Sequence, residues 1–426
     1  MGEGELRALL REHASRHAVP GAAIGVLHDG AAATAFFGVE DVTTGLSVTA
    51  QTGFSAGSLT KSMVATVVAR LAQEGRLALD DAVGAHVPEL RGCRWAERAS
   101  VRDLMANRSG LPLRADLEFG FDERKEADDG ALSRLAADVA VAEPIGEFWS
   151  YSNVGWCLLG RAIETATNTA WEYAMGRSLA DVGMRDTTFR PDIPRTRVSG
   201  HEVTAAGPVP VEPLSGRAYG PAGTTAVTTV DDLLRFAALH LQDPSLAGLR
   251  KVHADVSIDG WLDAWCLGWA RFEWAGEPVW GWDGLVNGER SVLRLLPDQK
   301  AAVALMTNAG TGRAMHRSLL TELVADLFAV GIPALRLEPE PGVPGDLERY
   351  AGVYAWPDRR VEVTVTDSGL LIQGEHEREA LPLDERTFLI DAADPDNPTV
   401  TFGAFDARGR PQVLYNMLWG LPRIDR

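Results

Sequence analysis

The chain has few cysteines and no long apolar run. Its 426 residues include three cysteines, Cys93, Cys157 and Cys266, which form an odd and widely spaced set without a CxxC pair. Such a set favours free thiols in a reducing compartment over a disulfide framework. No apolar run approaches the roughly 18 residues that a membrane-spanning helix requires, and the N-terminus lacks the apolar core of a secretory signal. We therefore expect a cytoplasmic protein with no membrane partner.

Positive charge is also scarce. The chain has 41 Lys and Arg against 59 Asp and Glu, which gives a net charge of −18 at pH 7. A protein without a basic excess does not attract the phosphate backbone of nucleic acids or anionic lipid. Nucleic acid is therefore not an expected partner, and the oligomeric state stays open.

Hydrophobic patterning divides the chain into segments of different type. Short apolar runs between turn residues predict strands over residues 20–56, and helical spacing of apolar residues dominates residues 58–240. Strand patterns return over residues 265–274 and 291–309. Strands at both ends with helices between them favour one α+β domain, residues 1–334, whose sheet is assembled from distant parts of the chain.

The C-terminal part has a different pattern. Residues 335–348 are rich in Pro, Gly and acidic residues, which is typical of a linker. Residues 349–426 then alternate apolar strand patterns with turn sequences such as DSG and ARGR. We predict a small, separate, all-β domain there.

Two serines are candidate nucleophiles within one short stretch. Gly53–Gly57 (GFSAG) matches the G-x-S-x-G nucleophile elbow and would use Ser55. An elbow needs a buried apolar strand before it and a histidine base, but the preceding residues are TAQT and no histidine is marked by its context. Ser58–Lys61 (SLTK) matches a second signature, S-x-x-K. Of the two serines, we favour Ser58.

Lys61 supports Ser58 because it is the lone charge in the first eighteen residues of the stretch from Thr52 to Gly75. On a helix, residues three apart lie on one face, so the Lys61 amine would lie beside the Ser58 hydroxyl. The apolar stripe that follows would desolvate this amine and lower its pKa, which would make Lys61 a base near neutral pH. The alternative is a lysine that extends to solvent from a frayed helix end.

A tyrosine and an asparagine follow in the tripeptide YSN, residues 151–153. The Tyr151 phenol can relay a proton between the lysine, the serine and a leaving group, and the Asn153 amide can hold a substrate carbonyl or the lysine. The simpler alternative is a tyrosine packed at a loop edge beside an asparagine that caps a helix.

With these residues in place, the chain resembles the serine β-lactamase and penicillin-binding-protein-like hydrolases, in the branch of class C β-lactamases, D,D-peptidases and family VIII carboxylesterases. Further matching segments follow in order: LALDDAVGAHVPEL, LMANRSGLP, GMRDTTF and GPAGTTAVTTVDDLLRFA. The resemblance implies an antiparallel sheet flanked by helices, an all-helical region beside it, and a site between the two. Residues 349–426 are similar to the lipocalin-like C-terminal domain of many such proteins. No metal or organic cofactor is implied.

The third motif of this family, Lys-Thr-Gly or His-x-Gly, corresponds here to Trp282-Asp283-Gly284. The resemblance implies that Gly284 lets the strand approach the substrate closely, and that the Leu285 N–H forms an oxyanion pair with the Ser58 N–H. Trp282 replaces the cation of the motif, and we expect its indole to lie on the substrate. A tryptophan at this place is similar to family VIII carboxylesterases and related acyltransferases, which act on esters and thioesters without requiring a free carboxylate.

The resemblance therefore implies a serine hydrolase of the carboxylesterase type that forms an acyl-enzyme on a small-molecule ester, thioester or amide. Lys61, with Tyr151, would take the proton of Ser58. The enzymatic alternatives are an acyltransferase, a thioesterase or peptide cyclase of the penicillin-binding-protein type, a β-lactamase, and a D-aminopeptidase or D,D-carboxypeptidase. A non-catalytic acyl-binding or sensor protein is an alternative of another class.

Overall fold

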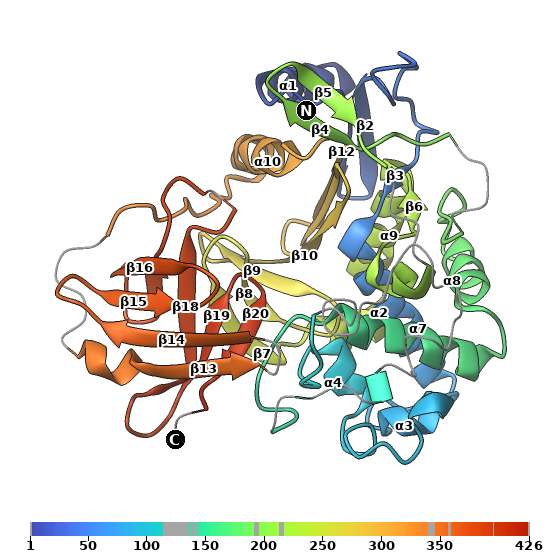
Figure 1. Ribbon diagram of the computed structural model, residues 1–426. Helices are drawn as coiled ribbons and strands as arrows, with labels where there is room; N and C mark the ends of the chain where they lie inside the picture. The colour runs from blue at the N-terminus through green and yellow to red at the C-terminus, as the bar shows by residue number, and fades with distance from the viewer. Residues whose placement is uncertain are drawn as a thin grey trace.

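Two antiparallel sheets of eight strands each organise the molecule (Figure 1). The computed structural model describes residues 2–113, 136–137, 141, 144–190, 196–212, 217–339, 346–356, 359–394 and 396–424. One sheet combines strands from the N-terminal and central parts of the chain and is covered by helices, whereas the other contains the C-terminal strands. This arrangement confirms the α+β class, with a helix-flanked sheet and an all-β C-terminal part.

The first sheet is assembled from distant segments, as the sequence pattern predicts. Its strand order is β2-β1-β12-β11-β10-β9-β8-β7. The N-terminal strand pairs antiparallel with the last strand of this part, from Ala22 opposite Thr307 to His28 opposite Ala301. The strands are β1 (Gly21–His28), β2 (Ala31–Gly38), β7 (Ala254–Ile258), β8 (Leu262–Trp265), β9 (Ala270–Trp274), β10 (Glu277–Val286), β11 (Glu289–Leu296) and β12 (Ala301–Thr307).

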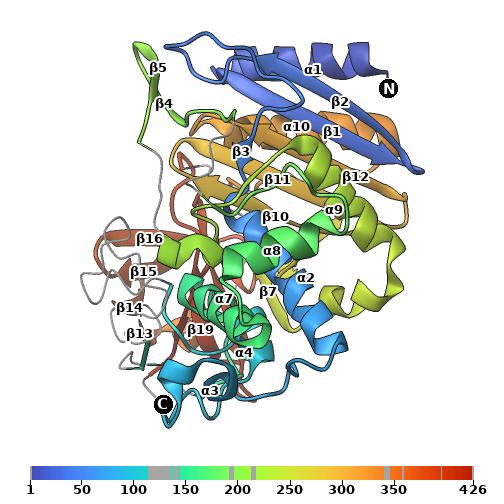
Figure 2. The same ribbon diagram turned by 90° about the vertical axis from the view of Figure 1, so that its right-hand side faces the viewer.

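Helices cover both faces of this sheet. On one face lie α1 (Glu3–Arg16) and α10 (Gly312–Phe328), which a hydrogen bond between their His13 and Glu322 side chains joins at 3.0 Å. On the other face lies α9 (Val230–Gln242), in front of the sheet in Figure 2. This helix packs closely, because a Cβ on Gly25 of β1 would lie 2.8 Å from Leu234 of α9.

A group of helices lies beside the sheet. The helices are α2 (Thr60–Gln73), α3 (Val83–His86), α4 (Val101–Met105), α7 (Asn153–Thr167) and α8 (Trp171–Ala180), with short 3₁₀ turns η1 (Gly57–Leu59), η2 (Pro88–Leu90), η3 (Arg217–Ala222) and η4 (Pro244–Arg250). Three short strands lie within the stretch that we expect to be mainly helical: β4 (His201–Thr204), β5 (Gly207–Pro210) and β6 (Val227–Thr228). Strand β4 pairs with β5. The pairing of β6 with β3 (Phe54–Ser55) places the chain just before Ser58 against the segment that precedes α9.

The strand pattern predicted over residues 20–56 is only partly realised. Beyond β2, one bridge pairs Val39 with Ser47, and no longer strand forms before β3 within the described residues. Turn hydrogen bonds take over there, since the Asp41 carboxylate accepts both the backbone N–H and the hydroxyl of Thr43 at 2.6 Å. An aspartate that binds the backbone two residues ahead favours a turn over a ladder.

The C-terminal sheet runs as a meander from its first strand to its last and nearly closes. A bridge from Tyr354 to Arg423 joins the two ends. Its aromatic core includes Tyr350 and Phe402, whose rings meet edge to face at 5.0 Å. The elements are η5 (Leu347–Tyr350), β13 (Gly352–Trp356), β14 (Arg359–Val365), β15 (Leu370–Gln373), β16 (Glu377–Pro382), β17 (Thr387–Leu389), β18 (Thr399–Phe405), β19 (Pro411–Asn416) and β20 (Trp419–Pro422).

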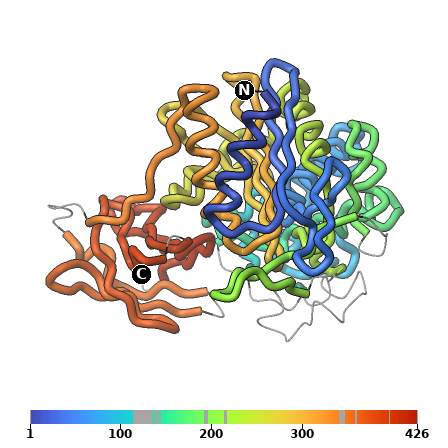
Figure 3. The backbone as a smooth tube through the Cα atoms, turned by 90° about the horizontal axis from the view of Figure 1, so that it is seen from above, coloured from blue at the N-terminus to red at the C-terminus, as the bar shows by residue number. Residues whose placement is uncertain are grey.

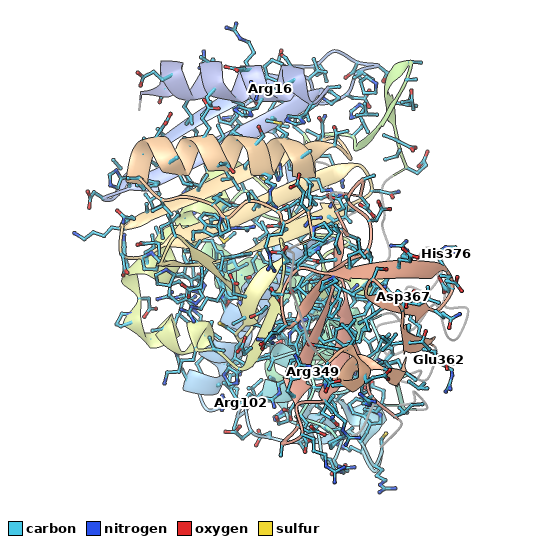
Figure 4. The ribbon with its side chains drawn as sticks, turned by 90° about the vertical axis from the view of Figure 1, so that its left-hand side faces the viewer. Arg16, Arg102, Arg349, Glu362, Asp367 and His376 are labelled. Atoms are coloured by element: carbon cyan, nitrogen blue, oxygen red, sulfur yellow. The ribbon has the colours of Figure 1, made fainter. Side chains whose placement is uncertain are left out.

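The outer rim of this sheet is charged and exposed, with Glu362, Asp367 and His376 projecting from it (Figure 4). Residues 340–345 of the predicted linker lie outside the described residues, so the domain limits at 334 and 349 stay a prediction. Among the described helices, none is both long and apolar enough to cross a membrane.

One end of the C-terminal sheet packs against the first sheet and its helices. Figure 3 shows the C-terminal sheet beside them. Tyr415 of β19 meets the ring of Trp149 at 6.0 Å, and both belong to the large core of the first sheet and its helices. Arg313 at the start of α10 donates to the Asp396 carboxylate at 2.8 Å. The Gly420 N–H donates to the Ser150 hydroxyl at 3.2 Å, which brings the start of β20 close to the residues that precede α7.

Candidate active site

Ser58 and Lys61 meet at the junction of η1 and α2. Ser58 lies within the 3₁₀ turn, and Lys61 lies in the first turn of the helix that continues from it. Lys61 Nζ donates to Ser58 Oγ at 3.0 Å and also to the carbonyl of Ala222. The spacing of three residues thus brings the amine to the hydroxyl, as helix geometry predicts.

Lys61 is fully buried, with 0% of its surface exposed. Burial lowers its pKa to about 7, and the nearby Cys157 acts in the opposite direction. A buried lysine loses its proton because the ammonium is the form that desolvation destabilises. The amine can therefore accept a proton from Ser58 at neutral pH, and the solvent-extended alternative for Lys61 is wrong.

Tyr151 contacts both Ser58 and Lys61. Its ring lies 5.0 Å from Lys61 Nζ, and its hydroxyl forms a side-chain hydrogen bond with Ser58. Burial raises the pKa of Tyr151 well above its ordinary value, and the hydrogen bonds from Ser58 and Trp282 only partly offset this. The phenol is therefore neutral at pH 7, so it can pass a proton on but is not itself the base.

Trp282 contacts the tyrosine as well as the cavity. Its indole Nε1 donates to the Tyr151 hydroxyl at 3.0 Å, and 2% of its surface is exposed. Its ring packs against those of Tyr151 and Trp265, with centroids 5.5 Å and 4.9 Å away. We expected an indole that lies on the substrate, but its one hydrogen-bond donor is already engaged by Tyr151. Only its ring is left to face a ligand.

Glycines bring β10 against the turn that carries Ser58. A Cβ on Gly57 would lie 2.7 Å from the Leu285 nitrogen, and one on Gly284 would lie 2.2 Å from the Ala56 carbonyl oxygen. Gly57 also has a left-handed φ of +53°. The absence of a side chain at Gly284 thus makes room for the segment before Ser58, and its approach to a substrate stays a prediction. The Leu285 nitrogen therefore lies beside Gly57, the residue that precedes Ser58, and the oxyanion pair of Ser58 and Leu285 stays a prediction.

A cavity of about 470 Å³ opens beside this group and includes Ser58, Tyr151, Trp282, Gly284 and Leu285 in its wall. Asn153, at the start of α7, also lines it, and within the described residues its Oδ1 is buried without a hydrogen-bond partner. That oxygen accepts hydrogen bonds only, so it suits an N–H of a ligand.

The turn between β19 and β20 completes the cavity wall with Met417, Leu418 and Trp419. The Leu418 carbonyl accepts the backbone N–H of Tyr151 at 3.0 Å. Nothing in the sequence marks these residues, because their role depends on how a distant sheet packs. The Ala222 carbonyl, which holds Lys61, is also absent from the sequence prediction, since any residue can supply a carbonyl.

Comparison with known proteins gives a consistent result. The family model described as "Beta-lactamase" matches residues 6–326. The chain belongs to the beta-lactamase family. Penicillin-binding protein 4 from Amycolatopsis lactamdurans is 31% identical over 365 residues, which are 80% of this chain and 94% of that protein. The family resemblance seen in the sequence is therefore confirmed, and the chain is a member of the serine β-lactamase and penicillin-binding-protein-like hydrolases.

Two solved structures extend the likeness of this beta-lactamase family member. The crystal structure of SurE is 27% identical with a TM-score of 0.83, and the match covers 99% of each chain. SurE has also been crystallised with D-Leu. A class C β-lactamase, 21% identical with a TM-score of 0.63, matches 76% of this chain and 97% of its own, which reflects the shared fold.

Ser55, the rival nucleophile, lies outside the cavity. It is 4% exposed, and its hydroxyl donates to the Glu289 carboxylate at 2.9 Å. Its backbone N–H binds the same carboxylate at 2.7 Å, and Arg197 pairs with that carboxylate at 3.0 Å. The ion pair with Arg197 stabilises that carboxylate in its charged form, and Ser55 does not line the cavity that contains Ser58. We therefore assign Ser55 to the structure of this beta-lactamase family member.

Three histidines downstream of Ser58 bind residues other than Ser58, and one of them, His316, also lines the cavity. His201 Nδ1 binds the Asn308 carbonyl at 2.9 Å, His240 binds the Thr66 hydroxyl at 2.9 Å, and His316 binds the Thr307 hydroxyl at 3.1 Å. Across the ranges that the structure describes, no group of His, Cys, Asp and Glu side chains is arranged to hold a metal ion.

Proposed function

We propose that this protein is a serine hydrolase of the carboxylesterase type that works through an acyl-enzyme on Ser58. Neutral Lys61 removes the Ser58 proton while Oγ bonds to the substrate carbonyl carbon. The backbone N–H groups of Ser58 and Leu285 stabilise the oxyanion. Tyr151 transfers its proton to the leaving alcohol or thiol as the bond of that group to the carbonyl breaks, and it takes up the proton that Lys61 removed from Ser58. Water then cleaves the acyl-enzyme.

The observation that carries this proposal is the 3.0 Å hydrogen bond between Lys61 Nζ and Ser58 Oγ in a fully buried setting. It supplies a nucleophile and a base with a pKa of about 7 within reach of each other. The neutral Trp282 at the third motif supports esters or thioesters over substrates recognised through a cation at that place.

The test is turnover of p-nitrophenyl esters, with nitrocefin and D-amino-acid amides measured alongside. Ser58→Ala is expected to abolish ester cleavage and labelling by a fluorophosphonate, whereas Ser55→Ala keeps both. Loss of labelling in Ser55→Ala with retention in Ser58→Ala would transfer the nucleophile to Ser55. Nitrocefin as the fastest substrate would instead support a β-lactamase.

A second candidate is acyl transfer from the same acyl-enzyme to an amine. Its support is the likeness to SurE along 99% of both chains and the crystallisation of SurE with D-Leu. In this reading the deprotonated amine of a D-amino acid replaces water as the attacking group.

Product analysis distinguishes the two candidates. A simple acyl thioester is incubated with the enzyme and with D-Leu or L-Leu, and the products are separated by mass. An amide formed with D-Leu and absent with L-Leu supports transfer. Free acid alone, at an unchanged rate in both mixtures, excludes transfer for these acceptors and leaves the hydrolase proposal intact.

A further inference from the structure

The candidate active-site cavity contains one guanidinium without a partner. Arg290 and Arg313 both line it, together with the carboxylate of Asp283. Arg313 donates to Asp396 at 2.8 Å, and Asp283 accepts from Arg294 at 2.6 Å. Within the described part of the chain, Arg290 Nε is buried without a hydrogen-bond partner, and no carboxylate forms an ion pair with Arg290. One positive charge in the cavity wall is therefore unmatched.

The position of Arg290 relates it to the reacting atoms. In the ladder of β10 and β11, Arg290 lies directly opposite Leu285, whose N–H we assign to the oxyanion pair. Directly opposed residues of an antiparallel ladder have their Cα atoms about 5 Å apart. The stem of Arg290 packs under α10, since a Cβ on Gly312 would lie 3.1 Å from both Cβ and Cγ of Arg290. A packed stem limits where the head group can go.

An unpaired cation in this setting is costly. Arg290 is half-buried, and desolvation lowers its pKa. The carboxylates of Asp396 and Asp283 oppose this shift, and the guanidinium of Arg313 adds to it. An arginine nevertheless keeps its proton in proteins, so the group does not escape the cost by becoming neutral. A buried charge is best stabilised by a partner of opposite sign with good hydrogen-bond geometry. A carboxylate matches the planar fork of a guanidinium through two parallel hydrogen bonds.

We propose that Arg290 binds a carboxylate of the substrate, so that the enzyme acts on esters or thioesters that carry a free carboxylate. The inference rests on the proposed acyl-enzyme function for the identity of the reacting bond. It also revises the expectation drawn from Trp282: the cation lost at the third motif is replaced by one on the neighbouring strand. The carboxylate can belong to the acyl group or to the leaving group.

Two pairs of esters test this proposal and distinguish the two positions. Mono-p-nitrophenyl adipate is compared with its methyl ester, which places or removes the charge on the acyl side. 4-Carboxyphenyl hexanoate is compared with 4-(methoxycarbonyl)phenyl hexanoate, in which the carboxylate of the leaving group is masked as a methyl ester. The enzyme is expected to prefer the charged member of one pair by about tenfold to a hundredfold in kcat/KM, the range for a charged hydrogen bond.

Three variants identify the cause of that preference. Arg290→Met keeps the stem but removes the charge, and it should abolish the preference while turnover of the neutral esters stays within about twofold. Arg290→Lys should restore part of the preference. Arg102→Met removes one positive charge on α4, where Arg102 pairs with Asp80 at 2.7 Å, and it should leave the preference unchanged. No preference in either pair, or a preference that survives in Arg290→Met, overturns the proposal.

A binding measurement covers the case in which no ester is cleaved. That result contradicts the proposed function, but the carboxylate site can still be tested by calorimetry with monomethyl adipate and dimethyl adipate. Binding of the monoester that Arg290→Met loses and Arg102→Met keeps supports the site. Equal binding of the two compounds, or none of either, overturns it. Ser58→Ala should bind the monoester as the natural chain does.

Discussion

The indole N–H of Trp282 donates a hydrogen bond to the hydroxyl of Tyr151 at 3.0 Å. The donor is neutral and occupies the motif position at which the family resemblance implies a cation. A neutral donor stabilises a phenolate less than a cation does, and burial already raises the pKa of Tyr151. Tyr151 therefore stays a phenol, which supports our proposal that the buried amine of Lys61 is the base.

Removal of this donor should slow the reaction. Trp282→Phe keeps a ring in place but leaves Tyr151 without the hydrogen bond, and we expect kcat for p-nitrophenyl esters to fall about tenfold, as for loss of one good hydrogen bond in a buried site. Trp280→Phe is the matched control, because Trp280 lies on the same strand and donates to the Arg250 carbonyl at 3.1 Å. An equal loss in both variants would contradict a role of Trp282 in the reaction.

The reaction should depend on pH through Lys61. Its pKa is lowered to about 7, and only the neutral amine accepts a proton, so kcat/KM should rise with pH and level off above about 7. A stopped-flow pH profile of acylation measures this rise. A rate that falls as pH rises from 6 to 8 would instead indicate that the ammonium is the active form.

The same shift makes stability depend on pH. Unfolded Lys61 has an ordinary pKa near 10.5, whereas folded Lys61 has a pKa of about 7. Between these values the unfolded chain binds the additional proton, so the free energy of unfolding should rise with pH by up to about 1.4 kcal/mol per pH unit. Urea titrations at pH 7 and pH 10 give the free energy of unfolding of the natural chain and of Lys61→Met. The change in the difference between the two proteins isolates the contribution of Lys61. If the difference in the free energy of unfolding between the two proteins is the same at both pH values, the predicted pH dependence is wrong.

Ser55 should matter for stability and not for activity. Ser55→Ala removes the hydroxyl that donates to Glu289, a buried carboxyl whose pKa is raised by burial. Loss of a hydrogen bond to a buried charged group should lower the free energy of unfolding by about 1.5–3 kcal/mol. Ser62→Ala is the control, because its hydroxyl donates to the neutral Gly268 carbonyl at 2.6 Å and should cost less. Ester turnover at 25 °C should be retained in Ser55→Ala.

Gly57→Ala should separate the turn of Ser58 from β10. Its Cβ would lie 2.7 Å from the Leu285 nitrogen, and its φ of +53° disfavours any Cβ. We expect a fall in kcat of more than about a hundredfold, typical of a lost oxyanion donor. Gly75→Ala is the control, because Gly75 also has a positive φ of +70° but nothing within 4 Å of the added Cβ. Gly75→Ala should lower the free energy of unfolding but leave kcat unchanged.

Gly420→Ala should move the C-terminal turn away from Tyr151. Its Cβ would lie 2.3 Å from the Trp149 carbonyl oxygen, beside the hydrogen bond from the Tyr151 N–H to the Leu418 carbonyl. We expect a lower kcat with both sheets still folded, as followed by circular dichroism. Gly374→Ala is the control within the same sheet, since its Cβ would lie 3.3 Å from the Val361 side chain and 3.8 Å from the Arg360 carbonyl oxygen. Unchanged activity in Gly420→Ala would show that the turn does not position Tyr151.

Local patterns predicted much of the candidate site. The S-x-x-K spacing places Lys61 at Ser58 because neighbours three apart on a helix share a face, whatever the rest of the chain does. The start of α9 follows from Thr229, whose hydroxyl accepts the Asp232 N–H at 3.3 Å. The strand prediction for residues 39–53 was wrong, because Asp41 and the threonines that follow bind their own backbone.

By itself, the sequence determined the local chemistry: a serine, a lysine three residues after it, and an apolar stripe that excludes water from the lysine amine. Only the tertiary structure decided that Trp282 donates to Tyr151, that Leu418 holds the backbone of Tyr151, and that Arg290 shares their cavity without a partner. These contacts join segments more than a hundred residues apart. Their geometry depends on how the two sheets and the helices pack, which no local spacing encodes.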